Sequence, residues 1–87
     1  MRSIISVIGK DEVGILAKVS TLCAEHNANI EAVTQHVVEG YFSMTMIACV
    51  DDMDCSIGEL QEFLDKVLPE TKNHVMHEDI FHAMHRI

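Results

Sequence analysis

Residues 30–50, with the sequence IEAVTQHVVEGYFSMTMIACV, contain the pattern that decides the fold. Residues 30–38 and 41–50 are two strand-like runs, separated only by Glu39-Gly40. A two-residue connection that contains glycine is typical of a tight β-hairpin. Along the second run alternate residues share one face of a strand, and both faces are partly apolar. One face carries Phe42, Met44, Met46, Ala48 and Val50, and the other carries Tyr41, Ser43, Thr45, Ile47 and Cys49.

The segments before the hairpin predict a strand followed by a helix. Residues 2–8 are mostly isoleucine, valine and serine, and Gly9 ends that run. From residue 12 onward the apolar residues recur at helical spacing, with Asp11 as the expected N-cap and Asn27 as the residue that ends the helix in a left-handed conformation. The predicted apolar stripe consists of Ile15, Leu16, Val19, Leu22 and Cys23.

The segments after the hairpin repeat this order. Ser56-Ile57-Gly58-Glu59 matches a capping box, which predicts a helix that Pro69 ends. Its apolar stripe is Ile57, Leu60, Phe63, Leu64, Val67 and Leu68. Residues 73–78 form a fourth, shorter predicted strand. Residues 79–87 are expected to add one or two helical turns, with Ile80, Phe81, Met84 and Ile87 on one side.

The resulting order, βαββαβ, predicts one α+β domain over residues 1–87. Right-handed crossovers around one hairpin give a ferredoxin-like sandwich, in which two helices cover one face of a four-stranded antiparallel sheet. The second face stays uncovered, so we expect the C-terminal tail or a second subunit to cover its apolar residues. A core this small also gains stability from association, and we therefore expect a homodimer.

The charge and composition exclude several classes of partner. The 87 residues have a net charge of −8, with 6 scattered Lys and Arg against 14 Asp and Glu. Nucleic-acid backbones and anionic lipids both require clustered cations, so we expect neither nucleic acid nor membrane as a partner. No apolar run approaches the roughly 20 residues that span a bilayer. Three cysteines without C-x-x-C spacing favour a reduced, cytoplasmic location.

The first strand-to-helix connection and the residues after it resemble a known sequence signature. Residues 11–17, DEVGILA, followed by Val19, Leu22 and Asn29-Ile30, resemble the D-x-x-G-I-x-A…V…L…N-I signature of ACT domains. Residues 7–11, VIGKD, and the tail segments HEDIF (77–81) and MHRI (84–87) are similar to the stand-alone ACT proteins of the UPF0237 family, which are related to the glycine cleavage system repressor.

This resemblance implies a βαββαβ regulatory module that typically binds amino acids at a subunit interface. Carried over by position, one side of the site consists of Asp11, Val13, Gly14 and Ile15, and the other side, from the neighbouring subunit, consists of Asn29 and Ile30. Glu12 stands where a basic residue often follows the aspartate of the motif. The expected function is a homodimer that binds a small ligand and signals to a partner protein. The alternative is a protein–protein association module without a small ligand.

Catalysis and metal binding are disfavoured by the placement of the reactive side chains. Cys23 lies on a core stripe, and Cys55 follows an acidic loop that raises a thiol pKa. No cysteine is therefore an expected nucleophile, and no cofactor is expected. His74 and His77 face opposite sides of a strand, whereas His82 and His85 converge on a helix but have no third or fourth ligand that the sequence can place. We therefore expect no metal site.

Overall fold

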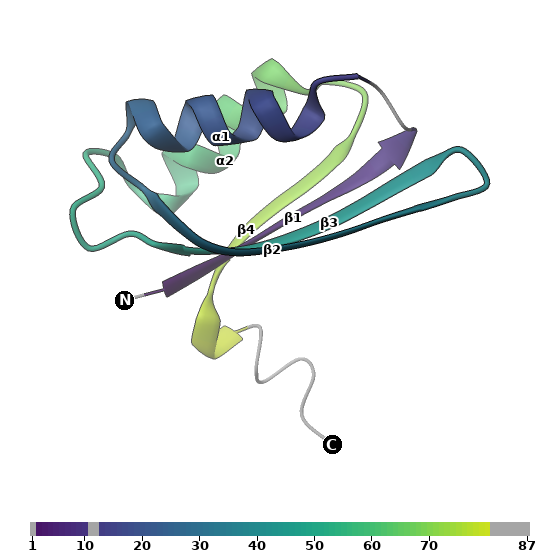
Figure 1. Ribbon diagram of the computed structural model, residues 1–87. Coiled ribbons are helices and arrows are strands. Elements are labelled where there is room, and N and C mark those ends of the chain that lie inside the picture. The colour runs from purple at the N-terminus through teal and green to yellow at the C-terminus, as the bar shows by residue number, and fades with distance from the viewer. Residues whose placement is uncertain (1, 11–12, 81–87) are drawn as a thin grey trace.

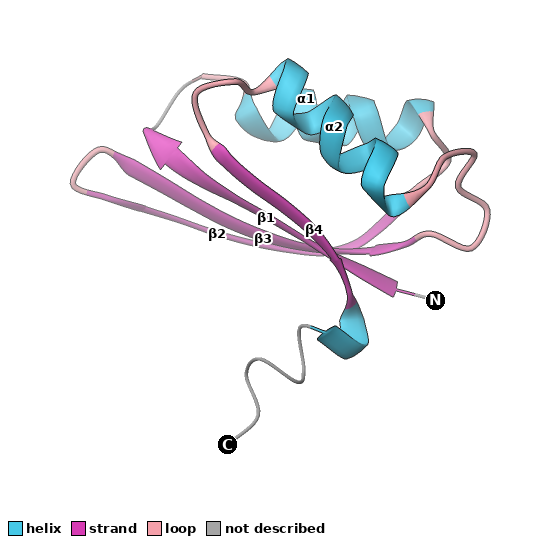
Figure 2. Ribbon diagram, turned by 180° about the vertical axis from the view of Figure 1, so that it is seen from behind, coloured by secondary structure: helices cyan, strands magenta, loops and turns pink. Residues whose placement is uncertain are grey.

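The computed structural model describes residues 2–10 and 13–80. Its elements are β1 (Arg2–Lys10), α1 (Ile15–Glu25), β2 (Asn29–Val38), β3 (Tyr41–Cys49), α2 (Ile57–Val67) and β4 (Lys72–His77). The sheet has the order β2-β3-β1-β4, and every neighbouring pair is antiparallel. Both helices cover the same face of the sheet (Figures 1 and 2). The predicted ferredoxin-like α+β sandwich is confirmed.

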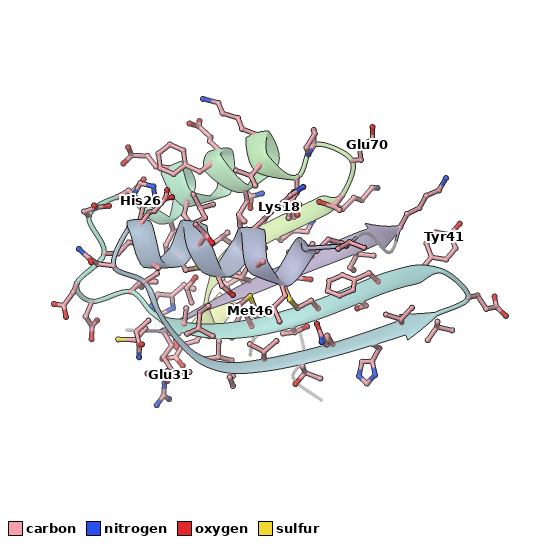
Figure 3. The ribbon with its side chains drawn as sticks, turned by 45° about the horizontal axis from the view of Figure 1, so that its top comes forward. Lys18, His26, Glu31, Tyr41, Met46 and Glu70 are labelled. Carbon is pink, nitrogen blue, oxygen red and sulfur yellow. The ribbon has the colours of Figure 1, made fainter. Side chains whose placement is uncertain are left out.

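The core lies between that face and the two helices. Residues paired across an antiparallel ladder share a face, and the β3 face that carries Phe42, Met44 and Met46 is the one that meets the helices. Figure 3 shows Met46 between the sheet and the helices. The innermost side chains are Ile5 and Val7 of β1, Met44 and Met46 of β3, Ile15, Val19 and Cys23 of α1, and Leu60 and Leu64 of α2, all at most 2% exposed.

Two local predictions are confirmed in detail. Glu39 and Gly40 both have positive φ, 52° and 81°, as the common two-residue hairpin turn requires. At the start of α2 the Glu59 N–H donates to Ser56 Oγ at 3.0 Å, and the Ser56 N–H donates to the Glu59 carboxylate at 3.1 Å. This capping box fixes the point where α2 begins.

The start of α1 corrects the sequence prediction. The helix begins at Ile15 and its N-cap is Gly14, which has a φ of 90°, rather than Asp11. A left-handed residue interrupts helical geometry, so the residues before Gly14 cannot belong to the same helix. Leu16 is also 37% exposed, because it lies at the edge of the predicted stripe. The end of α1 is as predicted, with Asn27 at a φ of 61°.

Gly9 lies where β1 passes close to Thr71. A Cβ added at Gly9 would lie 2.8 Å from Thr71 Cγ2 and 3.2 Å from Thr71 Cα. Thr71 cannot easily move away, because its hydroxyl donates to the Leu68 carbonyl at 2.9 Å. We expect Gly9→Ala to lower the free energy of unfolding by about 1–3 kcal/mol, the usual cost of overpacking. Urea denaturation measures this change.

Gly58→Ala is the matched control for that substitution. A Cβ at Gly58, in the first turn of α2, would meet nothing closer than Ser56 Oγ at 3.9 Å. Because alanine is the better helix former, this variant should be neutral or slightly stabilised. Equal stability of the two variants would contradict the close approach of Gly9 to Thr71.

The two edges of the sheet are protected differently. Gln61 of α2 donates its side-chain N–H to the Asn73 carbonyl and accepts the Val75 N–H at 2.7 Å, so its amide occupies backbone groups along the β4 edge. At the opposite edge, every residue of β2 is exposed except Ile30, which is half-buried. Within the described parts of the chain, no side chain donates to or accepts from the β2 backbone. The β2 edge is therefore the open one.

The face of the sheet away from the helices is only partly covered. Ile4 on this face is 3% exposed, beside Met76 of β4, and a helical turn at residues 78–80 lies below the sheet (Figure 1). Toward the hairpin the apolar side chains are open, with Ile8 at 49%, Val38 at 65% and Tyr41 at 61% exposure. The predicted tail residues Phe81, Met84 and Ile87, with His82 and His85, lie outside the described residues. None of the helices described is long and apolar enough to cross a membrane.

Candidate ligand-binding site

The turn before α1 is open toward solvent. Val13 is fully exposed, and no described atom beyond its chain neighbours lies within 4 Å of the position that a Cβ of Gly14 would occupy. The first-turn N–H groups of a helix have no intrahelical partner and carry partial positive charge. Gly14 itself offers no side chain to cap them. Within the described residues, Val13 and Gly14 therefore leave the N-terminus of α1 open to solvent.

The predicted residues of this turn differ in what they expose. Val13 presents its side chain and Gly14 presents its backbone. Ile15 is 2% exposed because its side chain packs in the core, so it offers a ligand only its backbone. Asp11 lies outside the described residues. The described residues of this half, Val13, Gly14 and Ile15, therefore offer mainly backbone groups.

The other predicted residues, Asn29 and Ile30, lie at the opposite end of α1. They line an open groove with a volume of about 510 Å³, together with Ser20, Ala24, Asn27, Ala28 and Asp52. The β2–β3 register shifts between Ile30 and Ala32, so a bulge bends β2 immediately beyond this groove. Sequence reasoning missed Ser20, Ala24 and Asp52. The spacing of Ser20 and Ala24, two small residues one turn apart, is the signal that marks a groove beside α1.

Within one chain these two halves are far apart. Gly14 precedes and Asn29 follows the 11-residue helix α1, which at 1.5 Å per residue is about 16 Å long. The sheet separates them as well. Asn29 pairs with Cys49, which pairs with Arg2 at the start of β1. Gly14 follows the other end of β1, where Lys10 pairs with Tyr41 and Tyr41 pairs with Val38. One subunit therefore does not bring the predicted residues together.

A third group of side chains meets where α1 ends and α2 is about to begin. One ring nitrogen of His26, a carboxylate oxygen of Asp54 and Cys55 Sγ all lie within 4.8 Å of one another. His26 Nδ1 and Asp54 Oδ1 are 2.8 Å apart. Sequence reasoning missed this cluster, because His26 lies 28 residues before Asp54 and the three residues follow no ligand spacing. The available signal was topological: a ferredoxin-like fold places the end of its first helix beside the start of its second.

The thiols of this region are poor nucleophiles. Burial raises the pKa of Cys23, and the nearby Cys55 raises it further. Desolvation raises the pKa of Cys55, and the carboxylates of Asp54 and Glu59 act in the same direction. An activated cysteine needs the opposite shift, toward the thiolate.

Comparison with known proteins identifies the family. Residues 3–61 match the family model of the ACT domain. The UPF0237 protein MK1213 of Methanopyrus kandleri is 43% identical over 88 residues, which cover 99% of this chain and 98% of that protein. The chain belongs to the ACT domain family, in its UPF0237 group.

Solved structures have folds similar to that of this ACT domain over most of its length. The ACT domain protein of Streptococcus pneumoniae is 31% identical, with a TM-score of 0.79 and 93% of each chain covered. A formyltetrahydrofolate deformylase of Pseudomonas syringae is 28% identical with a TM-score of 0.76, covering 87% of this chain but 27% of that enzyme. The ACT domain is a regulatory domain, and the UPF0237 name of its relative describes no enzyme.

Proposed function

We propose that this ACT domain forms a homodimer that binds a small ligand, such as an amino acid, between its subunits and signals occupancy to a partner protein. The observation that carries the proposal is the separation of the two half-sites. Gly14 and Asn29 lie at opposite ends of an 11-residue helix, and a second copy of the chain supplies the missing half at each end.

The open edge of the sheet is the favoured dimer interface. Because Gln61 occupies the β4 edge, the exposed β2 edge is the one with backbone groups left to pair. Figure 3 shows β2 running beyond α1 along an edge that neither helix covers. Pairing β2 with β2 of a second copy is a two-fold, self-complementary contact, and two-fold dimers are the commonest oligomers.

Antiparallel pairing across this edge accounts for the shared site. When two identical strands pair about a two-fold axis, the start of each lies beside the end of the other. The start of β2 carries Asn29. Its end, Val38, pairs with Tyr41, which pairs with Lys10 at the end of β1, and the chain continues from Lys10 to Gly14. The dimer would therefore place Asn29 of one subunit near the Gly14 turn of the other, twice per dimer.

The chemistry of the two half-sites suits an amino acid. The helix N-terminus with Gly14 receives a carboxylate. The Asn29 side chain contributes both a donor and an acceptor, which can meet a second polar group of the same molecule. The groove beside Asn29 has space for a side chain, and Ile30, Ala24 and Ala28 provide apolar lining.

A thermal-shift screen of the free amino acids at millimolar concentration tests the proposal. Binding to the folded dimer alone raises the melting temperature, by an amount that grows with occupancy. At least one amino acid should give a concentration-dependent rise. No response from any of them would contradict amino-acid sensing.

The association module is the second candidate, because of the apolar patch on the open sheet face. Ile8, Val38 and Tyr41 lie toward one end of this face, and each is about half or more exposed. Such a patch suits contact with another protein. A dimer that responds to no amino acid would favour this function.

A further inference from the structure

The junction between the end of α1 and the loop before α2 holds three different metal-binding groups. His26 is the C-cap of α1, and Asp54 and Cys55 immediately precede Ser56, the N-cap of α2. One imidazole nitrogen, one carboxylate oxygen and one sulfur lie within 4.8 Å of one another. Figure 3 shows His26 at the end of α1 that lies away from the hairpin residue Tyr41.

The surrounding contacts hold these groups in place. The Asp54 N–H donates to the His26 carbonyl at 3.1 Å, which ties the loop to the helix end. The His26 ring stacks on Phe63 of α2, with centroids 4.7 Å apart and planes 12° from parallel. Cys55 packs against the core. The backbone hydrogen bond and the ring stacking therefore keep the loop that carries Asp54 and Cys55 beside His26.

We propose that His26, Asp54 and Cys55 form a binding site for a divalent transition-metal ion of the zinc type. Imidazole and thiolate together select zinc-like ions over magnesium or calcium, which prefer oxygen ligands alone. Three protein ligands leave a fourth tetrahedral position for water. Cys55 exchanges its S–H bond for a metal–sulfur bond, and its proton passes to solvent.

The observed spacing requires only small movements. Ligand atoms around a tetrahedral zinc ion, at bond lengths of about 2.0–2.3 Å, lie about 3.3–3.8 Å from one another. The three donors already lie within 4.8 Å. The side chain of Asp54 is 54% exposed and that of His26 is 23% exposed, so solvent and metal reach the site from one side. The ion would fasten the two helix ends to each other, beside the groove that Asn27 and Asp52 line.

Cobalt titration of the chelator-treated protein tests this site, because Co²⁺ replaces Zn²⁺ and has visible and near-ultraviolet absorption. We expect a 1:1 complex with a thiolate-to-cobalt charge-transfer band, displaced by Zn²⁺. Cys55→Ser should remove that band and weaken Co²⁺ binding by at least about tenfold, because loss of even an outer-shell partner commonly costs about that much. His26→Gln should weaken binding to a similar degree.

Two control variants separate this site from other donors. Cys49→Ser removes a half-buried thiol from β3 and should leave the band and the affinity unchanged. His82→Ala combined with His85→Ala removes the tail histidines and should also leave both unchanged. Absence of a charge-transfer band in the original protein, or its persistence in Cys55→Ser with a folded circular dichroism spectrum, would overturn the proposal.

Discussion

A Gly14→Asn variant should lose amino-acid binding by roughly a hundredfold or more while remaining folded. Asparagine tolerates the left-handed conformation that Gly14 adopts, with its φ of 90°. Its side chain fills the space through which a ligand approaches the helix N-terminus. Lost charge-assisted hydrogen bonds cost about 1.5–3 kcal/mol and steric overlap about 1–3 kcal/mol, which together correspond to that factor. Isothermal titration with the most stabilising amino acid of the thermal-shift screen measures the loss.

Gly40→Asn is the matched control, because Gly40 also has a positive φ, 81°, and open space around its missing side chain. It lies in the hairpin turn, outside both proposed half-sites. Its backbone cost should equal that of Gly14→Asn, so both variants should melt at similar temperatures. Only Gly40→Asn should retain binding. Equal binding by both variants would remove Gly14 from the ligand site.

A proline in the middle of β2 should separate the proposed dimer into monomers. Thr34 and Gln35 are adjacent, and consecutive residues of a strand direct their N–H groups toward opposite edges. One of Thr34→Pro and Gln35→Pro therefore removes an outward N–H, which is lost twice in a two-fold interface. At about 1–3 kcal/mol for each unpaired partner group, the dimer is weakened by about 2–6 kcal/mol. Sedimentation equilibrium at micromolar concentration measures this change.

The other proline of the pair serves as an internal control. It removes a hydrogen bond between β2 and β3, so it should lower the melting temperature more than the outward substitution does. We expect the variant that melts higher to be the monomeric one. If both proline variants dimerise with the same affinity as the original protein, the subunits do not pair through this edge.

The sequence was sufficient for the features whose causes are local. The Glu39-Gly40 turn, the Ser56–Glu59 capping box and the alternation along β3 each depend on neighbouring residues, and all three were predicted correctly. The predicted start of α1 was wrong by several residues, because Asp11 is a good capping residue but the left-handed Gly14 that follows it sets the helix boundary. Propensity is a weak guide where the backbone conformation of one glycine sets the boundary.

The remaining features depend on contacts between segments distant in sequence. The hydrogen bonds of Gln61 to β4, which leave β2 as the open edge, join residues 12 and 14 positions apart. The bulge between Ile30 and Ala32 follows from the pairing of β2 with β3. Residue types alone do not specify either contact. For the ligand site, the sequence resemblance named both halves, and the fold adds that the two halves lie at opposite ends of α1.

The most direct test of the central claim is amino-acid binding by a mixture of Gly14→Asn and Asn29→Ala chains. Each variant alone carries a defect in both sites of its homodimer and should show no detectable binding at ligand concentrations near the Kd of the original protein. After denaturation and refolding together, a mixed dimer has one site with both halves intact, so equimolar mixing should restore about a quarter of the original binding capacity. If mixed dimers form, as mass spectrometry under native conditions can establish, yet no binding returns, the site does not lie between the subunits.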